Sequence, residues 1–451
     1  MAQDLIASSV SRVVVGLGVT GLSCARFLHQ HSIPFSVIDT RAQPPGLAQL
    51  REEMPDVPVY AGEYPQDVVT TATQLIVSPG IAMTDPLVRD ALEAGVEVLG
   101  DIDLFVEQAT APVIGITGSN AKSTVTELVG EMAKLAGLDV GVGGNLGTPA
   151  LELLDDAREL YVLELSSFQL ERAGQLNLAV ATVLNISADH LDRHGSLPAY
   201  HQAKHRIFRG AAKAVVNRDD RLTLPLVAPD VVVISWRMGE PELDGFGLRT
   251  IEGVEQLCHG FDALMPVSEL GMSGRHNIAN ALAAMAIGFA AGLPPAAMLE
   301  ALRSFKGLPH RCEVVADIDN VRYVNDSKGT NIGATEAALR GLGAQHNIVL
   351  IAGGQGKGAD FRQLRASVTA HCRCVVVIGE DAPLIEQALG DVVTVEQVTS
   401  LEAAVQYAAG AAHSGDTVLL SPACASFDMF SGYAQRGERF RAAVSALESG
   451  L

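Results

Sequence analysis

The sequence is short of several features that mark particular classes of protein. Aromatic residues make up 5% of its 451 residues, and there is a single tryptophan. Charged residues make up 19%, and the 32 basic side chains are outnumbered by 52 acidic ones, which gives a formal net charge of −20. Because such a chain repels phosphate backbones, its composition argues against sequence-independent nucleic-acid binding. It does not exclude small anionic ligands, which need only a local patch of donors.

Cysteines are also few. The six are scattered and form neither a disulfide framework nor a zinc-binding spacing. Cys372 and Cys374 lie beside His371, but no second pair of ligands follows, so we interpret them as strand residues. Reduced thiols predict a cytoplasmic protein. The segment from Met1 to Ser11 lacks a basic region, so no signal peptide is expected.

No long hydrophobic run is convincing as a membrane span. Residues 281–298 carry no charge, but they are mostly Ala and Gly and are interrupted by Pro294 and Pro295. We therefore expect a buried helix followed by a turn. The 48% of hydrophobic residues and the mean hydropathy of +0.23 argue against broad disorder, and the length suggests about three domains.

The pattern of strands, turns and helices predicts an α/β protein with domains at 1–100, 101–307 and 308–451. In the first, a strand at 12–15 meets the turn Gly16-x-Gly18-x-x-Gly21, a helix runs to Leu28, and a second strand ends at Asp39. This fits the dinucleotide-binding fingerprint. By itself the pattern leaves three hypotheses open: an NAD-dependent oxidoreductase, a site for another nucleotide, or a tight turn that binds nothing.

The second domain begins with a strand at 112–117, a loop at 118–124 and a helix expected at 125–136. The loop resembles a P-loop, although Ile116 and Ala121 occupy the two glycine positions of the strict motif. Lys122 could reach the β- and γ-phosphates and Ser123 could bind Mg²⁺. This favours ATP binding over the alternative, an ordinary lysine at the start of a helix.

Two later apolar strands, at 161–164 and 179–184, end next to polar residues. Glu164 would be costly to bury without a partner, and a metal ion would explain it. His190, after the second strand, is a candidate metal ligand. Lys204, on a helix expected to run to Phe208, has the alternative interpretation of a solvated surface residue.

The third domain repeats the strand-and-turn pattern, with strands at 349–352, 374–378 and 417–420. Basic residues lie in its loops, namely Arg311, Lys328 and Lys357. Each loop alone could be a plain turn, but together they suit an anionic ligand that faces the P-loop.

These motifs together resemble the Mur ligase family over essentially the whole chain. The segments that carry the resemblance are TGSNAKST (117–124), ELSSFQL (164–170), SADHLDRH (187–194), the HNxxN of His276, Asn277 and Asn280, LPHR (308–311), NDSKGTN (325–331) and GGQGKGADF (353–361). Folylpolyglutamate synthetases share parts of this set. The segments at 16–23, 39–46 and 420–437 look like those of the members that add D-glutamate.

The resemblance implies a Rossmann-like N-terminal domain that holds UDP rather than NAD, a central P-loop domain that binds MgATP, and a Rossmann-like C-terminal domain that brings in the amino acid. It implies an ATP-dependent ligase that adds D-glutamate to UDP-N-acetylmuramoyl-L-alanine through an acyl phosphate, with ATP and two Mg²⁺ sites. Such an enzyme would be a cytoplasmic monomer of peptidoglycan biosynthesis, and would thereby affect cell shape, cell division and the cell cycle. The alternatives are a ligase for another amino acid, the oxidoreductase, and a scaffold without activity.

The resemblance also implies site residues. Catalytic roles fall to Lys122, His190, Lys204, Asp326, Lys328 and Lys357. ATP would be bound by Gly118, Ser119, Asn120, Ala121, Lys122, Ser123, Thr124, Asn277, Asn280, Arg311 and Asp326. The UDP substrate would be bound by Gly18, Val19, Thr20, Asp39, Thr40, Arg41, Ser78, Gly80, Asn145, Ser166 and Gln169. D-glutamate would be bound by Lys328, Thr330, Lys357, Ser426, Phe427 and Tyr433. The metal ligands would be Ser123, Glu164, His190 and, if N-carbamylated as in the family, Lys204.

The chain departs from the family pattern at a few positions. Ala121 replaces the glycine that usually precedes the loop lysine, which adds strain only if the backbone there needs a positive φ. Gly329 replaces a common alanine. Phe427 and Tyr433 stand where other members carry Leu and Phe, which changes the shape of the pocket but not its charge. None of these changes removes a predicted catalytic group.

Overall fold

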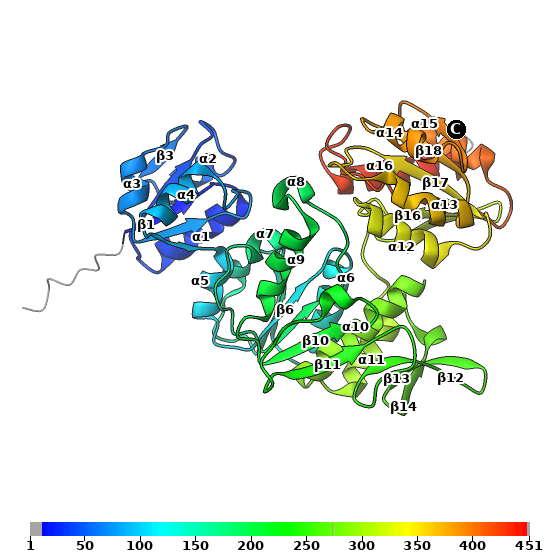
Figure 1. Ribbon diagram of the computed structural model, residues 1–451, viewed down its shortest axis with the longest axis horizontal. Coiled ribbons are helices and arrows are strands. Elements are labelled where there is room, and N and C mark those ends of the chain that lie inside the picture. The colour runs from blue at the N-terminus through cyan, green and yellow to red at the C-terminus, as the bar shows by residue number, and fades with distance from the viewer. Residues whose placement is uncertain (1–10, 273, 449–451) are drawn as a thin grey trace, which may run out of the picture.

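The computed structural model describes residues 11–272 and 274–448. They form three α/β domains, each built on its own sheet, as the sequence predicted. Figure 1 shows the N-terminal and C-terminal domains on opposite sides of the central one, with α8 (Leu191–His194) rising between them. The sequence analysis expected no signal peptide at the N-terminus, and that expectation concerns residues 1–10, which are outside the described residues.

The N-terminal domain has a five-stranded parallel sheet in the order β3-β2-β1-β4-β5. Its strands are β1 (Arg12–Val15), β2 (Phe35–Asp39), β3 (Val59–Ala61), β4 (Gln74–Val77) and β5 (Glu97–Leu99), and its helices are α1 (Val19–Gln30), α2 (Leu47–Glu53), α3 (Gln66–Thr71) and α4 (Pro86–Glu93). The apolar residues of β1 and β4 are buried because helices cover both faces of a parallel sheet. The strand order reverses between β1 and β4, and ligands of open α/β sheets generally bind beside the carboxyl ends of such strands.

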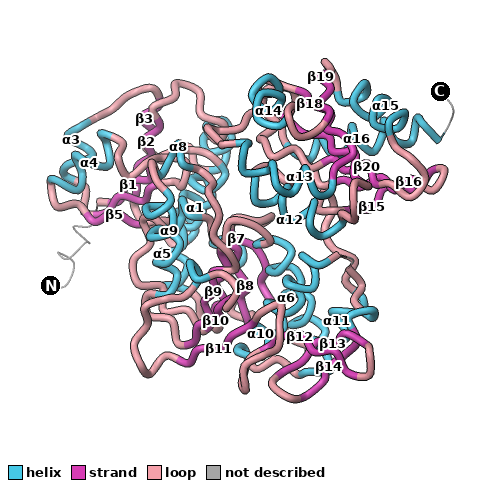
Figure 2. Tube along the Cα trace, turned by 45° about the vertical axis from the view of Figure 1, so that its right-hand side comes forward, coloured by secondary structure: helices cyan, strands magenta, loops and turns pink. Residues whose placement is uncertain are grey.

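The central domain has a nine-stranded sheet in the order β14-β13-β12-β11-β10-β9-β6-β8-β7. Its strands are β6 (Val113–Thr117), β7 (Val140–Gly144), β8 (Leu160–Glu164), β9 (Val180–Val183), β10 (Lys213–Asn217), β11 (Val232–Trp236), β12 (Phe246–Ile251), β13 (Val254–His259) and β14 (Asp262–Pro266). Its helices are α5 (Asp101–Gln108), α6 (Lys122–Leu135), α7 (Ser167–Leu170), α8, α9 (Leu197–His205), α10 (Arg275–Ala291) and α11 (Pro295–Ser304). Figure 2 shows helices on either side of the parallel strands.

The C-terminal domain has a six-stranded sheet in the order β15-β16-β20-β17-β18-β19, parallel except for the β15–β16 pair. Its strands are β15 (Glu313–Ile318), β16 (Val321–Asn325), β17 (Ile348–Gly353), β18 (Cys372–Ile378), β19 (Thr394–Gln397) and β20 (Thr417–Leu420). Its helices are α12 (Ile332–Leu342), α13 (Arg365–His371), α14 (Ala382–Leu389), α15 (Leu401–Ala411) and α16 (Tyr433–Glu448). Cys372 and Cys374 lie in β18, as predicted, and all six cysteines are free.

Two details differ from the sequence prediction. Helix α6 begins at Lys122 rather than Val125, because the left-handed Ala121 turns the chain directly into the helix. Helix α9 ends at His205, and residues 206–208 form a 3-10 turn. The uncharged stretch at 281–298 is the buried part of α10 followed by a turn, as expected. Within the two described ranges, no helix combines the length and apolar character needed to cross a membrane.

Candidate active site between the central and C-terminal domains

The loop after β6 has the geometry of a phosphate-binding loop. Ala121 adopts φ 66°, and α6 follows at once, so the positive end of the helix faces the loop. The Lys122 ammonium folds back and donates to the carbonyl oxygens of Gly118 and Ser119, both at 3.0 Å. Burial lowers the pKa of Lys122, although the charges of Glu164 and Asp189 oppose that shift. The loop therefore presents a positive, sheltered surface.

Glu164 at the end of β8 is joined to the loop. The Ser123 hydroxyl donates to one of its oxygens at 2.5 Å, and the Asn145 amide donates to the other at 2.7 Å. The Arg311 guanidinium from the C-terminal domain donates to the Ser123 oxygen at 2.6 Å. Burial raises the pKa of Glu164, but Lys122 and the two hydrogen bonds outweigh it, so the pKa lies below its ordinary value. This buried group is thus an ionised oxygen donor.

Asp189 and His190 follow β9 at the same edge of the sheet. His190 adopts φ 52°, and its ring packs edge-on against the Phe168 ring, with centroids 4.9 Å apart. Burial lowers the pKa of His190, so the imidazole is neutral near pH 7 and keeps a lone pair. Asp189 accepts hydrogen bonds from two residues of the C-terminal domain, Lys357 at 3.1 Å and Asn331 at 3.0 Å.

Lys204 is not the surface residue that one sequence interpretation allowed. It is only 1% exposed on α9, where its ammonium donates to the Thr117 hydroxyl at 3.2 Å and lies 4.7 Å from the centre of the Tyr200 ring. Burial, reinforced by the charge of Lys122, holds the pKa of Lys204 well below its ordinary value. The lowered pKa makes the neutral, nucleophilic form of this amine more accessible than in an exposed lysine.

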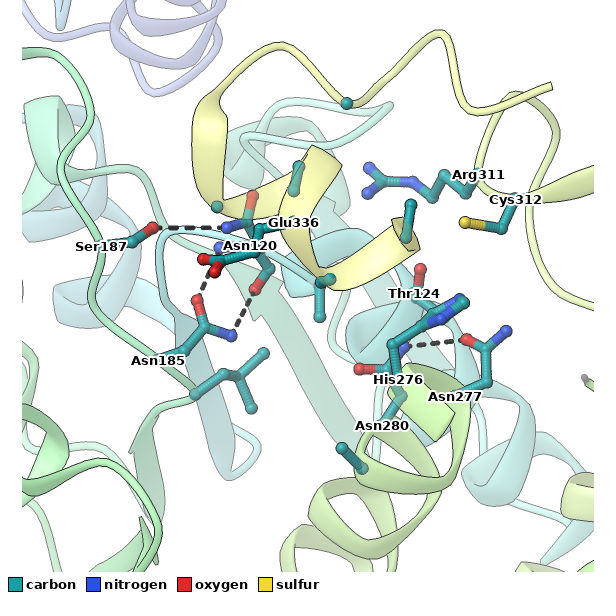
Figure 3. A pocket seen from close by; sticks show the side chains of 18 of the residues that line it. Asn120, Thr124, Asn185, Ser187, His276, Asn277, Asn280, Arg311, Cys312 and Glu336 are labelled. Carbon is teal, nitrogen blue, oxygen red and sulfur yellow. Dashed lines mark hydrogen bonds between the residues drawn. The ribbon is translucent and has the colours of Figure 1, made fainter. Parts of the chain in front are cut away.

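A cavity of about 410 Å³ lies between the central and C-terminal domains beside the P-loop. Figure 3 shows Asn120 bridged to Asn185 and Ser187 on one side, and His276, Asn277 and Asn280 on the other, with Arg311 reaching in from the C-terminal domain. Of the predicted ATP-binding residues, seven line this cavity: Asn120, Ala121, Thr124, Asn277, Asn280, Arg311 and Asp326. Its size and mixed lining suit a nucleotide.

A second, smaller cavity of about 120 Å³ is lined by Asp189 and His190 on the central side and by Thr330, Asn331 and Lys357 on the C-terminal side. It therefore brings two predicted D-glutamate residues next to a predicted metal ligand. Lys357 carries φ 54° and already pairs with Asp189. The cavity combines a cation, a neutral imidazole and hydrogen-bonding groups at the seam of the two domains.

Lys328 lines the larger cavity instead. Its ammonium lies 3.9 Å from the centre of the Tyr433 ring. Burial, together with the charges of Arg311 and Lys122, lowers the pKa of Lys328 to about 8. Asp326 accepts from the Ser421 hydroxyl at 2.7 Å, and burial raises the pKa of Asp326 to about 6. The predicted D-glutamate residues are therefore divided, with Ser426 buried and Phe427 71% exposed outside both cavities.

In the glycine-rich turn of the N-terminal domain, backbone atoms lie too close together to leave room for a side chain. A Cβ on Gly21 would lie 1.8 Å from the carbonyl oxygen of Gly16, so only glycine fits there. Asp39 is 3% exposed, and its oxygens accept from the Leu17 amide at 2.7 Å and from the Arg41 backbone and guanidinium. Asp39 therefore holds the turn and Arg41 together. The remaining predicted UDP residues of this domain, Gly18, Val19, Thr20, Thr40, Ser78 and Gly80, surround the same strand ends and are partly or fully exposed.

Two predicted substrate residues of the central domain are engaged within the protein. Ser166 and Gln169 form the capping box of α7: the Ser166 hydroxyl accepts from the Gln169 amide nitrogen, and the Gln169 side chain accepts from the Ser166 amide. The Gln169 amide group also donates to Asp101 at 2.8 Å. These residues shape the turn beside Glu164, and Asn145 reaches that carboxylate directly.

Sequence reasoning missed several residues that organise the site. Asn185 and Asp189 carried a usable signal, because each is polar and follows an apolar strand. Arg436 carried none: it is 1% exposed, and it donates to the Ser327 carbonyl at 2.8 Å and to the Cys424 carbonyl at 3.1 Å. Arg436 therefore links the loop after β16, which contains Ser327, to the loop after β20, which contains Cys424.

The donor set fits a hard divalent cation. Mg²⁺ prefers carboxylate and hydroxyl oxygens, and Glu164 with Ser123 supplies both beside the P-loop. Within residues 11–272 and 274–448, however, no group of three or more His, Cys, Asp or Glu side chains gathers in a shape that could hold a metal ion. Any cation here would need phosphate oxygens, water or a modified Lys204 to complete its shell.

Models of known families match three stretches of the chain. The family described as "Mur ligase MurD-like, N-terminal domain" matches residues 10–100, "Mur ligase middle domain" matches 116–288, and "Mur ligase, glutamate ligase domain" matches 310–424. Together they cover most of the sequence, in the order that the three sheets follow. The chain belongs to the Mur ligase family.

Curated relatives of the Mur ligase family match at full length. A UDP-N-acetylmuramoylalanine--D-glutamate ligase from Pseudomonas savastanoi pv. phaseolicola is 56% identical over 446 residues, which cover 98% of this chain and 100% of the relative. The protein of the same name from Pseudomonas aeruginosa is 54% identical over the same shares. The family expected from the sequence motifs is thus confirmed.

Solved structures of other ligases share the fold. The MurF ligase of Thermotoga maritima in complex with ADP aligns with a TM-score of 0.61 at 18% identity, over 98% of this chain and 96% of that one. A pseudomurein peptide ligase type C from Methanothermus fervidus aligns with the same TM-score and identity, over 97% and 100%. The three-domain α/β architecture predicted from the sequence is therefore confirmed.

Proposed function

We propose that this chain is an ATP-dependent ligase that joins D-glutamate to UDP-N-acetylmuramoyl-L-alanine in peptidoglycan biosynthesis. The observation that carries the proposal is the meeting of the P-loop, Glu164, His190 and the Lys357 cavity at one seam between two domains. The full-length relatives that bear this name support the choice of D-glutamate. Membership in the Mur ligase family leaves the oxidoreductase hypothesis without support.

We further propose a division of labour among the domains, with boundaries at 1–100, 101–307 and 308–451. The N-terminal domain binds the UDP end of the substrate, the central domain binds MgATP, and the C-terminal domain binds D-glutamate. The two cavities at the seam support this division, because an active site assembled from two domains can exclude water when they close.

The reaction needs the L-alanine carboxylate to acquire a leaving group. Its oxygen takes the γ-phosphoryl group of ATP, which gives an acyl phosphate and ADP. The neutral amine of D-glutamate then attacks the acyl carbon, the C–O bond to phosphate breaks, and a proton leaves the nitrogen as the amide forms. Such phosphoryl transfer is mostly positioning and charge neutralisation.

The residues at the P-loop supply that neutralisation. In the proposal, Lys122 and Arg311 face the phosphate oxygens, while Asn277, Asn280 and Asp326 line the nucleoside end of the larger cavity. Mg²⁺, when bound through Glu164 and Ser123, with a second ion near His190 and a carbamylated Lys204, would neutralise further phosphate charge. Binding at Ser123 requires the Arg311 and Glu164 hydrogen bonds at its hydroxyl to rearrange.

D-glutamate carries two carboxylates, so its site needs cations and N–H donors. We assign Lys328, Lys357 and Thr330 to it, with Tyr433, Ser426 and Phe427 at its border. Lys328 and Lys357 line different cavities in this structure, so the proposed site would be completed when the two domains close. Lys357 now pairs with Asp189, so substrate binding would replace one carboxylate partner with another. We also propose that the enzyme is a cytoplasmic monomer and that it serves cell shape, cell division and the cell cycle through the cell wall.

The assignment is tested by an amino-acid panel. Phosphate release should require UDP-N-acetylmuramoyl-L-alanine, ATP, Mg²⁺ and D-glutamate together. Equal turnover with L-alanine, L-lysine or meso-diaminopimelate would contradict the amino-acid assignment and leave the family intact. No turnover with any member of the panel would favour the scaffold without activity. The Lys122→Ala variant is the control, because it removes the cation at the P-loop and should abolish release.

A further inference from the structure

An arginine of the central domain is buried against the N-terminal domain. Arg172 lies just after α7, and its side chain has no exposed surface. Its guanidinium donates to the carbonyl oxygens of Val77 and Ser78, both at 2.8 Å, and of Ile81 at 2.7 Å. Val77 is the last residue of β4, and Ser78 and Ile81 belong to the turn that follows it, which also carries two of the predicted UDP-binding residues, Ser78 and Gly80.

A second arginine reaches the same turn from α8. Arg193 donates to the carbonyl oxygens of Ile81 at 2.7 Å and Gly80 at 3.2 Å, and to the carboxylate of Glu171 at 2.7 Å. Glu171 also pairs with Arg172 at 3.5 Å. We call Glu171, Arg172 and Arg193 the turn clamp.

The turn clamp buries a charged guanidinium, which costs desolvation free energy, and its contacts stabilise one path of the turn after β4. Burial lowers the pKa of Arg172 to about 10, so the guanidinium remains charged at pH 7. A buried charge is tolerated only when its donors are satisfied, and here backbone carbonyls satisfy them. Because the acceptors are main-chain atoms, the contacts fix the path of the turn whatever its side chains are. The planar fork of an arginine fits several such acceptors at once, which a lysine cannot do.

The turn clamp also touches the catalytic motif. The Arg193 guanidinium lies 4.8 Å from the centre of the Phe168 ring, and that ring packs against His190 with centroids 4.9 Å apart. Within its own domain the turn has independent support, because the Ser78 amide donates to Val15 and the Ser78 hydroxyl donates to Gly16. Loss of the clamp should therefore free the turn from the central domain without unfolding it.

We propose that Glu171, Arg172 and Arg193 are positioning residues that set the span between the UDP-binding turn and the reacting carboxylate. This inference rests on the proposed function. A substrate held at its two ends by two domains gains from the second contact only if the distance between the sites matches its length. The turn clamp keeps that distance fixed, so it should act on the whole substrate and not on its separate parts.

The test uses the full-length enzyme and three variants. Arg172→Lys keeps the charge but loses the fork, and Arg193→Gln removes the less buried arm. The control is Arg158→Gln, because Arg158 donates to the Leu153 carbonyl and to the Asp139 carboxylate, both within the central domain and outside the turn clamp. Steady-state kinetics give KM for each substrate, and calorimetry gives Kd for UDP alone and for ATP.

For both turn-clamp variants we expect KM for UDP-N-acetylmuramoyl-L-alanine to rise about tenfold, with a fall in kcat, because the two ends are no longer held in register. The Kd values for UDP and ATP, and KM for D-glutamate, should stay within about twofold of wild type. Unchanged UDP and ATP binding also shows that a variant is folded. If Arg172→Lys does not fold, Arg193→Gln carries the same expectation.

Two outcomes would overturn the inference. In one, the turn-clamp variants match Arg158→Gln in every constant. In the other, UDP alone loses affinity as much as the whole substrate does, which would mean that the clamp shapes the turn itself. Failure of the proposed function looks different, since wild-type enzyme would then not turn over the D-glutamate mixture at all while still showing its UDP and ATP affinities.

Discussion

At the residue scale, burial changes what several ionisable groups can do. Lys204 and Lys328 are both lysines near other cations, and both have lowered pKa values, but they face different partners. Lys204 lies under the P-loop strand with a hydroxyl and an aromatic ring, whereas Lys328 lies in the larger cavity beside Arg311. The first suits covalent modification and the second suits the binding of a carboxylate.

Lys204→Ala should reduce kcat by about 100-fold, as expected for loss of a group that completes a metal shell. Its neutral amine can add to CO₂ and lose a proton, which yields a carbamate with two oxygen donors. Added acetate or formate should therefore restore part of the activity of Lys204→Ala. The control is Lys213→Ala, a partly buried lysine on β10 that donates to the Ala290 carbonyl and should show neither loss nor rescue. An undiminished kcat for Lys204→Ala would contradict the role.

Lys328 predicts a pH dependence. With a pKa of about 8, it is mostly charged at pH 7 and mostly neutral at pH 9, so KM for D-glutamate should rise as the pH passes through about 8. Between about 8 and the ordinary 10.5 the unfolded chain binds more protons at this position, so folding stability rises with pH while substrate binding weakens. In Lys328→Arg the charge persists and the rise in KM should disappear. An equal rise in that variant would assign the effect to another group.

At the element scale, the junction of β6 and α6 carries a backbone strain that a glycine at position 121 would not have. Ala121 adopts φ 66° and ψ −7°. The sequence left open whether the backbone here needs a positive φ, and the structure shows that it does. A left-handed conformation costs an L-residue about 1–2 kcal/mol. The junction tolerates this because α6 packs tightly against α10 and α11 behind it.

Ala121→Gly should therefore stabilise the protein by about 0.5–1 kcal/mol, since relief of the strain outweighs the greater flexibility of glycine in the unfolded chain. Thermal unfolding monitored by calorimetry measures the change, and ATP affinity should not fall. The matched control is Ala136→Gly at the other end of α6, where φ is −75° and there is no strain to relieve. That variant should be destabilised. A thermal unfolding midpoint for Ala121→Gly below that of the wild-type protein would mean that packing of the Ala121 methyl group outweighs the backbone strain.

At the scale of the whole molecule, the C-terminal domain is docked on the central one through a few polar contacts. Lys357 pairs with Asp189, Asn331 donates to Asn120, and Arg311 donates to Ser123. Such contacts exchange readily with ligand and water, so the same cations can hold the domains together and bind anions. The excess of acidic residues elsewhere leaves the net charge at −20 without removing these local donors.

The single tryptophan gives a direct readout of this seam. Trp236 ends β11, is 5% exposed and lines the larger cavity. Addition of ATP should therefore change its emission, whereas UDP should not, because the N-terminal domain has no tryptophan. A Trp236→Phe variant should bind ATP in calorimetry without an optical signal. Binding of ATP to wild-type protein with no change in emission would place the nucleotide elsewhere.

Much of this protein was determined by the sequence alone. Apolar strands that end in a polar residue such as Glu164, or are followed by one such as His190, predicted the α/β domains and the edge of the sheet where the candidate site lies, because parallel strands share that edge. The pattern also predicted the phosphate-binding loop, since strand, Lys122 and helix are local in the chain. Patterns formed by residues close together in the sequence can be recognised without any knowledge of how the elements pack.

Only the tertiary structure decided how distant segments combine. It buried Lys204 beneath the P-loop, divided Lys328 from Lys357 between two cavities, and set Arg172 against a turn about 90 residues away in the chain. No spacing reveals such contacts, because buried arginines and lysines look like surface residues in a sequence. Desolvation and nearby charges set the pKa values of these groups. Both arise only when the chain has folded and the domains are in contact.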